Sequence, residues 1–261
     1  MKRWIGPLSL LALTAALVAV GSAGASQSAT SPVKKSFKYC SDPTFPPMES
    51  TTTGGKPTGF DIDMANAIGK LWKVKANFVQ TAFPGLLPAL QSKRCNMVIS
   101  GIFITPDRVK QFPAVAYMKT HRALIVQAGN PKKIKGPNDL AGKNVAVQAG
   151  TKYEEYLKGL QKKFRFTLQS YPGDNDAVAQ VLLGRADAVL TQDTSFAYQA
   201  KQHPGKIAIG YTFAASDRFG VYFRKGDDVG AQISAGLKKL KANGALAKIA
   251  GKYQIPASTV K

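Results

Sequence analysis

Apolar and polar positions along this chain follow two alternating patterns. Short runs of β-branched and other apolar residues predict buried strands, and apolar residues three or four positions apart predict helices between them. Strands are expected at 37–40, 77–80 and 96–101, then at 144–147, 166–168 and 186–190. Helices are expected over 60–71, around 86–90, and from caps at Thr151 and Asp174. Strands that alternate with helices are typical of parallel sheets.

The two halves of the chain repeat this order. Residues 88–101 and 180–192 both run from the end of a helix, through basic residues, into an apolar strand. This similarity favours two α/β lobes over one continuous sheet. Apolar segments at 122–127 and 219–223 are expected to cross between the lobes, and C-terminal helices from Val229 are expected to rejoin the first lobe. Two crossings make a hinge, and a hinge between lobes makes a ligand cleft.

The N-terminus predicts a cleaved leader. Lys2 and Arg3 precede an apolar run from residue 5 to residue 20, and small residues follow up to Ala25. This is the layout of a secretory signal peptide, with cleavage expected near Ala25. The apolar run is short for a membrane span, and no cysteine lies beside the cleavage site to carry a lipid. The sequence therefore predicts an exported protein that starts near Ser26.

The charge is strongly basic. The chain carries a net charge of +21, and loss of Lys2 and Arg3 with the leader leaves about +19. The basic residues are spread along the chain, without an arginine-rich block or aromatic residues between them. This pattern argues against specific nucleic-acid binding. It favours a solvated basic surface that attracts anionic membranes or anionic partners.

Two cysteines, Cys40 and Cys95, are present. An oxidising compartment would permit a disulfide between them. Cys40 is expected near the end of one strand and Cys95 before the start of its neighbour, whereas a disulfide needs Cα atoms within about 7 Å. A disulfide and two buried thiols both stay open at this stage, and the strand positions favour thiols.

The segment Ser100–Arg108 contains the clearest candidate chemistry. It ends a buried strand and opens a helix, with Thr105 as the expected cap and Pro106 at the first helical position. Arg108 then lies in the first turn, near the carboxyl end of the strand, where open α/β sheets bind ligands. A guanidinium beside free backbone N–H groups suits a carboxylate. An ordinary surface pair with a neighbouring acid is the alternative.

Seven segments, in matching order, resemble one known family. They are DPTFPPME (42–49), GFDIDMANAIG (59–69), GLLPALQS (85–92), SGIFITPDR (100–108), VQAGTKYEEYL (147–157), GRADAVLTQD (184–193) and GVYFRKGDD (220–228). The chain resembles the polar amino-acid-binding proteins of bacterial ABC importers, the extracellular solute-binding proteins of family 3. The resemblance implies a periplasmic-binding-protein-like type II fold, with two α/β lobes joined by a two-strand hinge. Lobe 1 would comprise 26–119 and 220–261, and lobe 2 would comprise 120–219, with crossings near 117–124 and 215–223.

The resemblance also implies a function and its partners. The protein would be the substrate-binding component of an ABC amino-acid importer. It would close on a polar L-amino acid and deliver it to an inner-membrane permease. It would work in the periplasm as a monomer, with no cofactor, no metal and no nucleic-acid partner.

The resemblance assigns each site residue to one part of the amino acid. Arg108 would clamp the α-carboxylate with backbone N–H groups near Gly101, Phe103, Thr151 and Lys152; Asp193, with groups around Ser100, would hold the α-ammonium; Phe45 and Phe83 would flank the ligand; and Asp42 would lie near its side chain. Both charges of a zwitterion need partners once it leaves water, because an unpaired buried charge costs several kcal/mol. A cation from one lobe and an anion from the other would meet this requirement.

Several of these residues have simpler interpretations. Asp193 could be an ordinary helix cap, and the two flanking phenylalanines could be core. Asp42 could cap the turn before Pro43. Phe103 and Lys152 depart from the family, in which a hydroxyl residue is common at both positions, so the identity of the amino acid stays open.

Two other classes of function compete with binding. One is a periplasmic dehydratase of the cyclohexadienyl or arogenate type on the same fold. It would need a positioned acid or base, and neither His121 nor His203 falls in a recognisable nucleophile or metal constellation. The other is a membrane-adhering basic protein without a small ligand, which leaves the Arg108 and Asp193 pair unexplained.

Overall fold

The computed structural model describes residue 1 and residues 35–260, so residues 2–25 of the predicted leader lie outside the described residues. Eight strands of the described part form one sheet in the order β4-β1-β5-β10-β6-β9-β7-β8. They are β1 (Ser36–Ser41), β4 (Lys75–Gln80), β5 (Met97–Val98), β6 (Ala114–Gln127), β7 (Asn144–Gln148), β8 (Thr167–Tyr171), β9 (Ala188–Gln192) and β10 (Ile207–Phe223). A two-stranded sheet pairs β2 (Ser50–Thr51) with β3 (Pro57–Thr58).

The helices alternate with these strands much as the apolar spacing predicts. They are α1 (Phe60–Trp72), α2 (Leu86–Gln91), α3 (Pro106–Gln111), α4 (Lys152–Gln161), α5 (Asp174–Leu182), α6 (Asp193–Gln202), α7 (Val229–Ala242) and α8 (Ala245–Lys252). Short 3-10 helices cover Phe83–Gly85, Pro137–Leu140 and Ala257–Val260. Within the described residues, no helix has the length and apolar character needed to cross a bilayer.

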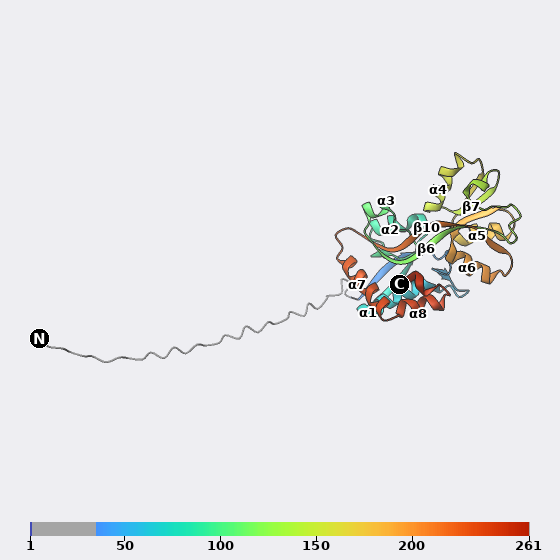
Figure 1. The fold of residues 1–261 in the computed structure, drawn as a ribbon. Coiled ribbons are helices and arrows are strands. Elements are labelled where there is room, and N and C mark those ends of the chain that lie inside the picture. The colour runs from blue at the N-terminus through green and yellow to red at the C-terminus, as the bar shows by residue number, and fades with distance from the viewer. Residues whose placement is uncertain (2–34, 261) are drawn as a thin grey trace. The chain divides into compact units, whose positions relative to one another are not determined.

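The two halves of the molecule share the long strands β6 and β10, which run side by side between them (Figure 1). In the first half, β1 pairs in parallel with β4 and β5, and β5 pairs with the end of β10. In the second half, β9 pairs with the end of β6, and β7 lies in parallel between β9 and β8. Hydrogen bonding therefore runs through all eight strands. The sequence favoured two lobes over one continuous sheet, and this expectation is wrong for the sheet. Strands β6 and β10 are long enough to take part in both halves, so the sheet continues through them.

The returning strand is longer than its apolar pattern predicts. Residues 219–223 were expected to cross, whereas β10 begins at Ile207. In the middle of β10, most of residues 214–218 are exposed. This part of the strand contains the polar run Ser216, Asp217 and Arg218. No apolar alternation marks such a stretch as a strand. Its pairing with β6, which has three register shifts, sets its extent instead.

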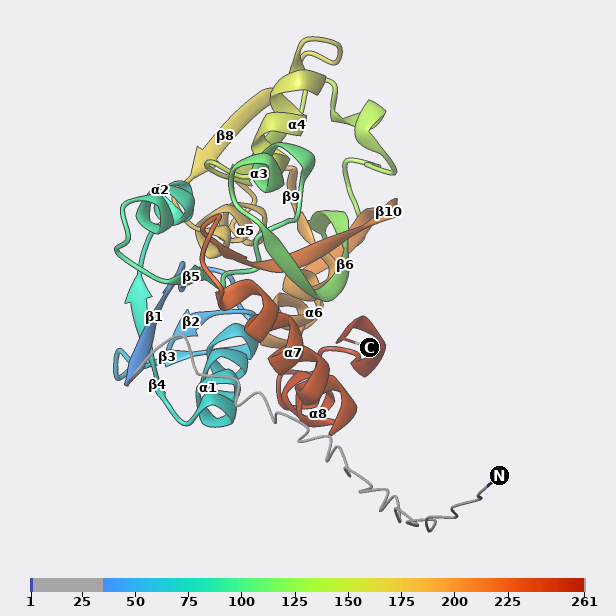
Figure 2. The same ribbon diagram turned by 90° about the vertical axis from the view of Figure 1, so that its left-hand side faces the viewer.

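The C-terminal helices rejoin the first half, as predicted. Helices α7 and α8 pack against α1 and against each other (Figure 2). The predicted inner face of α7 is buried, and Ile68 of α1 is fully buried in the same apolar core as Ile233, Leu237 and Leu240. Burying these side chains removes apolar area from water, which is the main favourable contribution to folding.

Cys40 and Cys95 form a disulfide, with their Cα atoms 5.7 Å apart. The interpretation as two thiols is therefore wrong. The register places Tyr39 opposite Met97 and Cys40 opposite Val98. The chain bends at Asn96, whose backbone N–H donates to the carbonyl of Lys38. This bend brings Cys95 back toward β1, although an extended chain would have carried it away.

Candidate functional site

Arg108 is a largely buried cation that has no acidic partner among the described residues. Thr105 caps α3, as predicted, and its side chain accepts a hydrogen bond from the backbone N–H of Arg108. The guanidinium donates to the carbonyl of Phe103 at 3.1 Å and lies 5.8 Å from the ring centroid of Phe83. Burial lowers the pKa of Arg108 from its usual value. Within the described residues this guanidinium forms no ion pair, so it can receive an anion.

The backbone turn before α3 lies against this cation. Gly101 has a φ of +47°, and a Cβ there would approach the Phe45 ring to 2.6 Å. Its backbone N–H donates to Asp61 Oδ2 at 2.7 Å. Ser100 is fully buried; its hydroxyl donates to Glu49 and accepts from the N–H of Asp42. These hydrogen bonds hold the turn itself, and they already use the N–H of Gly101 and the O–H of Ser100.

The start of α4 faces Arg108 from the second half of the sheet. Thr151 caps this helix, as predicted, and Glu154 reaches back to the N–H of Gly150. Lys152 Nζ lies 3.4 Å from Asp107 of α3 and 2.6 Å from Glu155. The N-terminus of a helix carries unpaired N–H groups and a partial positive charge, which favours an anion.

Asp174 supplies a carboxylate on the same half. It was expected to cap α5, but the N-cap is Gly173, and the Asp174 side chain instead accepts from Thr191 Oγ1 at 2.6 Å and Ser195 Oγ at 2.7 Å. The prediction that Asp174 caps α5 is therefore wrong. Its carboxylate accepts hydrogen bonds from these two hydroxyls, on β9 and α6, and among the described residues it makes no capping hydrogen bond to α5. Burial raises its pKa to about 6, against an ordinary value of 3.8.

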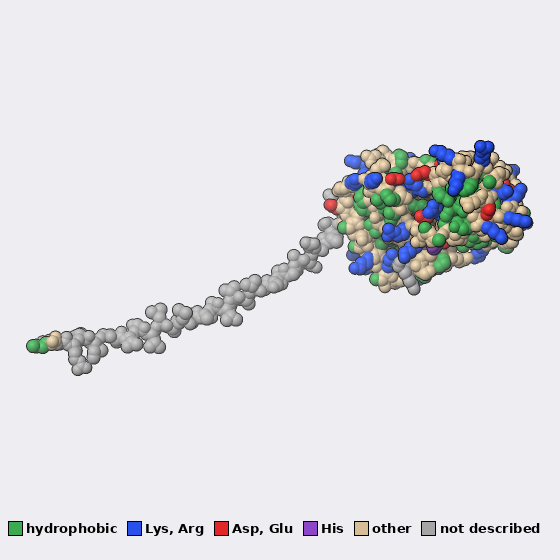
Figure 3. All heavy atoms as spheres, turned by 45° about the horizontal axis from the view of Figure 1, so that its top comes forward, with side chains coloured by type: hydrophobic (Ala, Val, Ile, Leu, Met, Phe, Trp, Pro, Cys, Tyr) green, Lys and Arg blue, Asp and Glu red, His purple; other side chains and the backbone are tan. Residues whose placement is uncertain are grey.

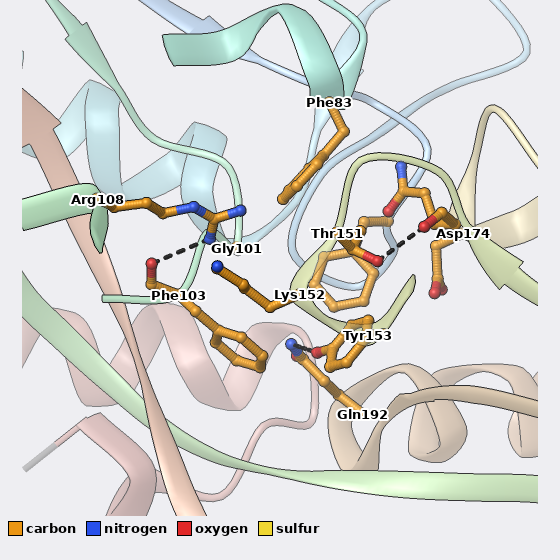
Figure 4. Close-up of a pocket in the computed structure, with 11 residues that line it drawn as sticks. Phe83, Gly101, Phe103, Arg108, Thr151, Lys152, Tyr153, Asp174 and Gln192 are labelled. Carbon is orange, nitrogen blue, oxygen red and sulfur yellow. Dashed lines mark hydrogen bonds between the residues drawn. The ribbon is translucent and has the colours of Figure 1, made fainter. Parts of the chain in front are cut away.

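These groups line one pocket between α3 and the strand ends of the second half (Figure 4). Its lining residues are Phe45, Phe83, Gly101, Phe103, Arg108, Gln148, Thr151, Lys152, Tyr153, Asp174 and Gln192. Four of them are aromatic. The rings of Phe103 and Tyr153 pack edge to face, with their centroids 5.3 Å apart. The side-chain amide of Gln192 donates a hydrogen bond to the Tyr153 hydroxyl. The pocket thus combines a cation, a carboxylate and apolar walls.

The free space in the pocket is small. Its free volume is about 20 Å³, room for about one water molecule. Hydrogen bonds join the two halves beside it, from Gln148 Nε2 to Asp42 Oδ2 at 2.8 Å and from the Asn175 N–H to the Thr44 carbonyl at 3.0 Å. A molecule larger than water can enter only if the halves separate or the lining side chains move.

The structure brings seven of the ten predicted site residues to this pocket and leaves three outside. Ser100 lies in the turn described above. Asp42 is buried beside the pocket, where its carboxylate accepts from the Phe83 N–H and from Gln148, and burial raises its pKa. Asp193 accepts from the Thr120 hydroxyl at 2.6 Å and lies 3.3 Å from His121 Nδ1. Gln192 is the last residue of β9 and lines the pocket, whereas Asp193 is the first residue of α6 and is not among the lining residues.

Four lining residues were missed: Gln148, Tyr153, Asp174 and Gln192. Gln148 ends β7 and Gln192 ends β9, and Asp174 follows β8 by three positions. The carboxyl ends of neighbouring parallel strands lie at one edge of a sheet. A search for polar residues at strand ends could therefore have found three of the four. Tyr153 is nearly buried within α4 and looks like core in the sequence.

Comparison with known proteins decides the family. Residues 37–255 match the profile of the bacterial extracellular solute-binding proteins, family 3. The chain belongs to this family. The match spans nearly all of the described residues, so the resemblance noted from seven short segments extends through both halves of the sheet.

Named relatives of this family 3 protein bind amino acids. The chain is 30% identical over 267 residues to the lysine/arginine/ornithine-binding periplasmic protein of Escherichia coli (strain K12), covering 97% of each chain. A solved structure of an ancestral arginine-binding protein bound to arginine has a TM-score of 0.80 and 33% identity, covering 84% of this chain and 98% of that one. An ancestral amino acid-binding protein described as a precursor of cyclohexadienyl dehydratase has a TM-score of 0.77 and 32% identity, covering 84% and 95%. These neighbours confirm the type II fold of the family 3 protein.

Proposed function

We propose that this solute-binding protein binds a polar L-amino acid between the two halves of its sheet and delivers it to an ABC permease. The observation that carries the proposal is the buried guanidinium of Arg108, which has no acidic partner in the described residues and shares a pocket with Asp174. A zwitterion offers an anion to the first group and a cation to the second. The named relatives, which bind lysine, arginine or ornithine, support the same class of ligand.

The α-carboxylate belongs beside Arg108. The guanidinium can present two parallel N–H donors to a carboxylate. Thr151, Lys152 and Tyr153 of the α4 N-terminus line the same pocket, and Lys152 adds a second positive charge at its edge. In this proposal the groups that hold the carboxylate come from both halves, so the bound ligand stabilises the closed arrangement.

The α-ammonium belongs beside Asp174, in place of the Asp193 assignment that the resemblance implied. Asp174 is the acidic residue among those that line the pocket. The side-chain oxygen of Gln192 can accept a further hydrogen bond from the ammonium. Aromatic side chains at positions 45, 83, 103 and 153 then enclose the aliphatic part of the ligand.

Closure would turn about the two crossing strands. We propose lobes of 26–119 with 220–261 and of 120–219, joined where β6 and β10 pass between them. The cross-pocket hydrogen bonds from Gln148 and Asn175 would break on opening and form again on closing. The proposal also includes cleavage near Ala25, work in the periplasm as a monomer, and no catalysis.

The test is a thermal-shift screen of the purified mature protein against the twenty amino acids, ornithine and citrulline. L-Arginine and L-lysine come first because of the relatives' ligands. A ligand at about a thousand times its Kd adds roughly 4 kcal/mol to stability, which raises Tm by about 8 to 16 °C for a protein of this size. Prephenate and arogenate serve as the comparison set. A folded, ligand-free protein that responds to none of the amino acids, or that dehydrates prephenate, contradicts the proposal.

Amino-acid affinity is expected to fall as the pH drops below about 6. The pKa of Asp174 is about 6, so its carboxylate is charged above this pH and protonated below it. Only the charged form pairs with an ammonium, so affinity should decrease about fivefold between pH 6 and pH 5, with the slope approaching about tenfold per pH unit below that. Isothermal titration calorimetry over this range measures the slope.

The variant Asp174→Asn provides the control for this pH dependence. It should bind weakly at every pH and lose the slope. Burial also raises the pKa of Asp61, but Asp61 does not line the pocket. A slope that persists in Asp174→Asn would assign the titration to Asp61 or another group and remove Asp174 as the ammonium partner.

A further inference from the structure

The end of the second half that lies opposite the pocket carries a dense group of cations. We call this the basic surface and define it by Lys132, Lys133, Lys135, Lys143, Lys162, Lys163, Arg165 and Arg185. Seven of these residues are exposed, and Lys143 is partly exposed. Figure 3 shows lysine and arginine side chains over the right-hand end of the molecule, where Figure 1 places α4, β7 and α5.

Backbone contacts hold these segments together. The Gly142 N–H donates to the Arg165 carbonyl at 2.8 Å, and the Thr167 N–H donates to the Lys143 carbonyl at 2.9 Å. The Asp187 N–H donates to the Asn144 carbonyl at 2.8 Å, which brings the turn containing Arg185 beside them. The basic surface is therefore one continuous region, although it is built from three separate parts of the chain.

Acidic side chains do little to neutralise it. The segments 130–143, 162–167 and 183–187 contain two acids, Asp139 and Asp187. Asp187 pairs with Lys132 at 3.5 Å and also accepts from the Asn144 N–H. Asp139 accepts from the Lys135 N–H. Eight cations against two acids leave a strong local excess of positive charge.

An exposed leucine lies in the same region. Leu183, at the end of α5, is 60% exposed and is two residues from Arg185. A single exposed leucine is common on protein surfaces. Cations around an exposed apolar side chain, however, match the boundary between lipid headgroups and acyl chains, where charge attracts the protein and the apolar group inserts.

The strand directions place this surface away from the pocket. Lys143, Arg165 and Arg185 precede β7, β8 and β9, whereas Gln148, Asp174 and Gln192 lie at or beyond the other ends of those strands. A five-residue strand is about 16 Å long. A flat partner on the basic surface would therefore leave the pocket free.

We propose that the basic surface docks this solute-binding protein on an anionic phospholipid membrane, with Leu183 at the headgroup boundary. Docking would keep the loaded protein close to the membrane that carries its permease. The attraction is electrostatic over several residues and needs no specific lipid.

Vesicle sedimentation tests the proposal. The mature protein should sediment with vesicles of phosphatidylcholine mixed with phosphatidylglycerol and stay in solution with phosphatidylcholine alone. Binding should disappear near 1 M salt, where the Debye length is about 3 Å. Equal binding to both kinds of vesicle overturns the electrostatic basis.

Two variants of equal charge locate the surface. In the first, Lys133, Lys135, Lys162 and Lys163 are replaced by glutamine; in the second, Lys238, Lys239, Lys241 and Lys248 of α7 and α8 are replaced by glutamine. A cation near an anionic surface contributes about a fivefold factor in partitioning, so the first variant should lose at least about a hundredfold. The second should stay within a few-fold of the parent. Equal losses would mean that net charge alone binds the vesicle, and the assignment of this surface would fail. Circular dichroism melting of both variants checks folding.

The variant Leu183→Ser tests whether the partner of the basic surface is a membrane or a soluble polyanion. Leu183→Ser should lower vesicle binding about tenfold, because burial of part of the leucine side chain is lost, and should leave retention on immobilised polyphosphate unchanged. If Leu183→Ser binds vesicles as the parent does, while polyphosphate competes fully for the basic surface, the partner is a soluble polyanion and the membrane proposal is overturned.

Discussion

Replacing Arg108 with alanine is expected to reduce amino-acid affinity at least about a hundredfold and to leave the fold intact. The guanidinium is largely buried, and among the described residues its polar partner is the carbonyl of Phe103. Truncating one member of a buried, hydrogen-bonded charge pair costs about 3 kcal/mol or more. The carboxylate of the ligand would be left with Lys152 and the α4 N-terminus. Isothermal titration calorimetry with the ligand from the screen measures the loss.

Two variants bracket this result. Arg108→Lys keeps the charge but loses the planar fork of donors, so its affinity should lie between those of the parent and Arg108→Ala. Arg94→Ala removes the same charge from an exposed position whose side chain donates to the Gln80 carbonyl, and it should bind normally. The Tm of ligand-free Arg108→Ala should change little, because within the described part of the chain the substitution breaks no ion pair. Parent-like affinity in Arg108→Ala would remove the carboxylate clamp and require another anchor for the ligand.

The local signals in the sequence predicted the helix start around Arg108 well. Thr105, Pro106 and Arg108 are neighbours in the chain, so a cap and a helix start fix their geometry without knowledge of the rest of the fold. The Thr151 cap was predicted for the same reason. Most strand and helix positions follow likewise, since an apolar run or a helical spacing is read within one element.

Predictions that depended on register were less successful. Gln192 and Asp193 are adjacent, but β9 ends at Gln192 and α6 begins at Asp193, so the two side chains take different directions. The sequence contains an acid at 193, but β9 directs residue 192 into the pocket. Asp174 was recognised only as a cap, because its true partners, Thr191 and Ser195, lie on other elements. The length of strand β10 was underestimated for a related reason. Its pairing with β6 sets its length, and this pairing cannot be inferred from the polar sequence of β10 itself.

Loss of the Cys40–Cys95 disulfide is expected to lower Tm by about 8 to 16 °C. The two cysteines are 55 residues apart, and a closed loop of this length restricts the unfolded chain by about 4 kcal/mol in the loop-entropy account. A change of 1 kcal/mol shifts Tm by about 2 to 4 °C in a protein of this size. The double variant Cys40→Ala with Cys95→Ala should show this loss in a calorimetric scan, and addition of a reductant should shift the parent but not the variant.

Amino-acid binding distinguishes a structural role of this disulfide from a functional one. Both cysteines are buried in the apolar cluster that includes Leu86 and Leu90, and neither lines the pocket. The double variant should therefore bind its ligand within a few-fold of the parent at temperatures well below its Tm. Two results together would contradict the disulfide: two free thiols in the parent protein by mass spectrometry, and a parent Tm equal to that of the double variant. They would support the two buried thiols that the strand positions favoured. Because the bend at Asn96 is what brings Cys95 to β1, that outcome would also contradict the local path of the chain between α2 and β5.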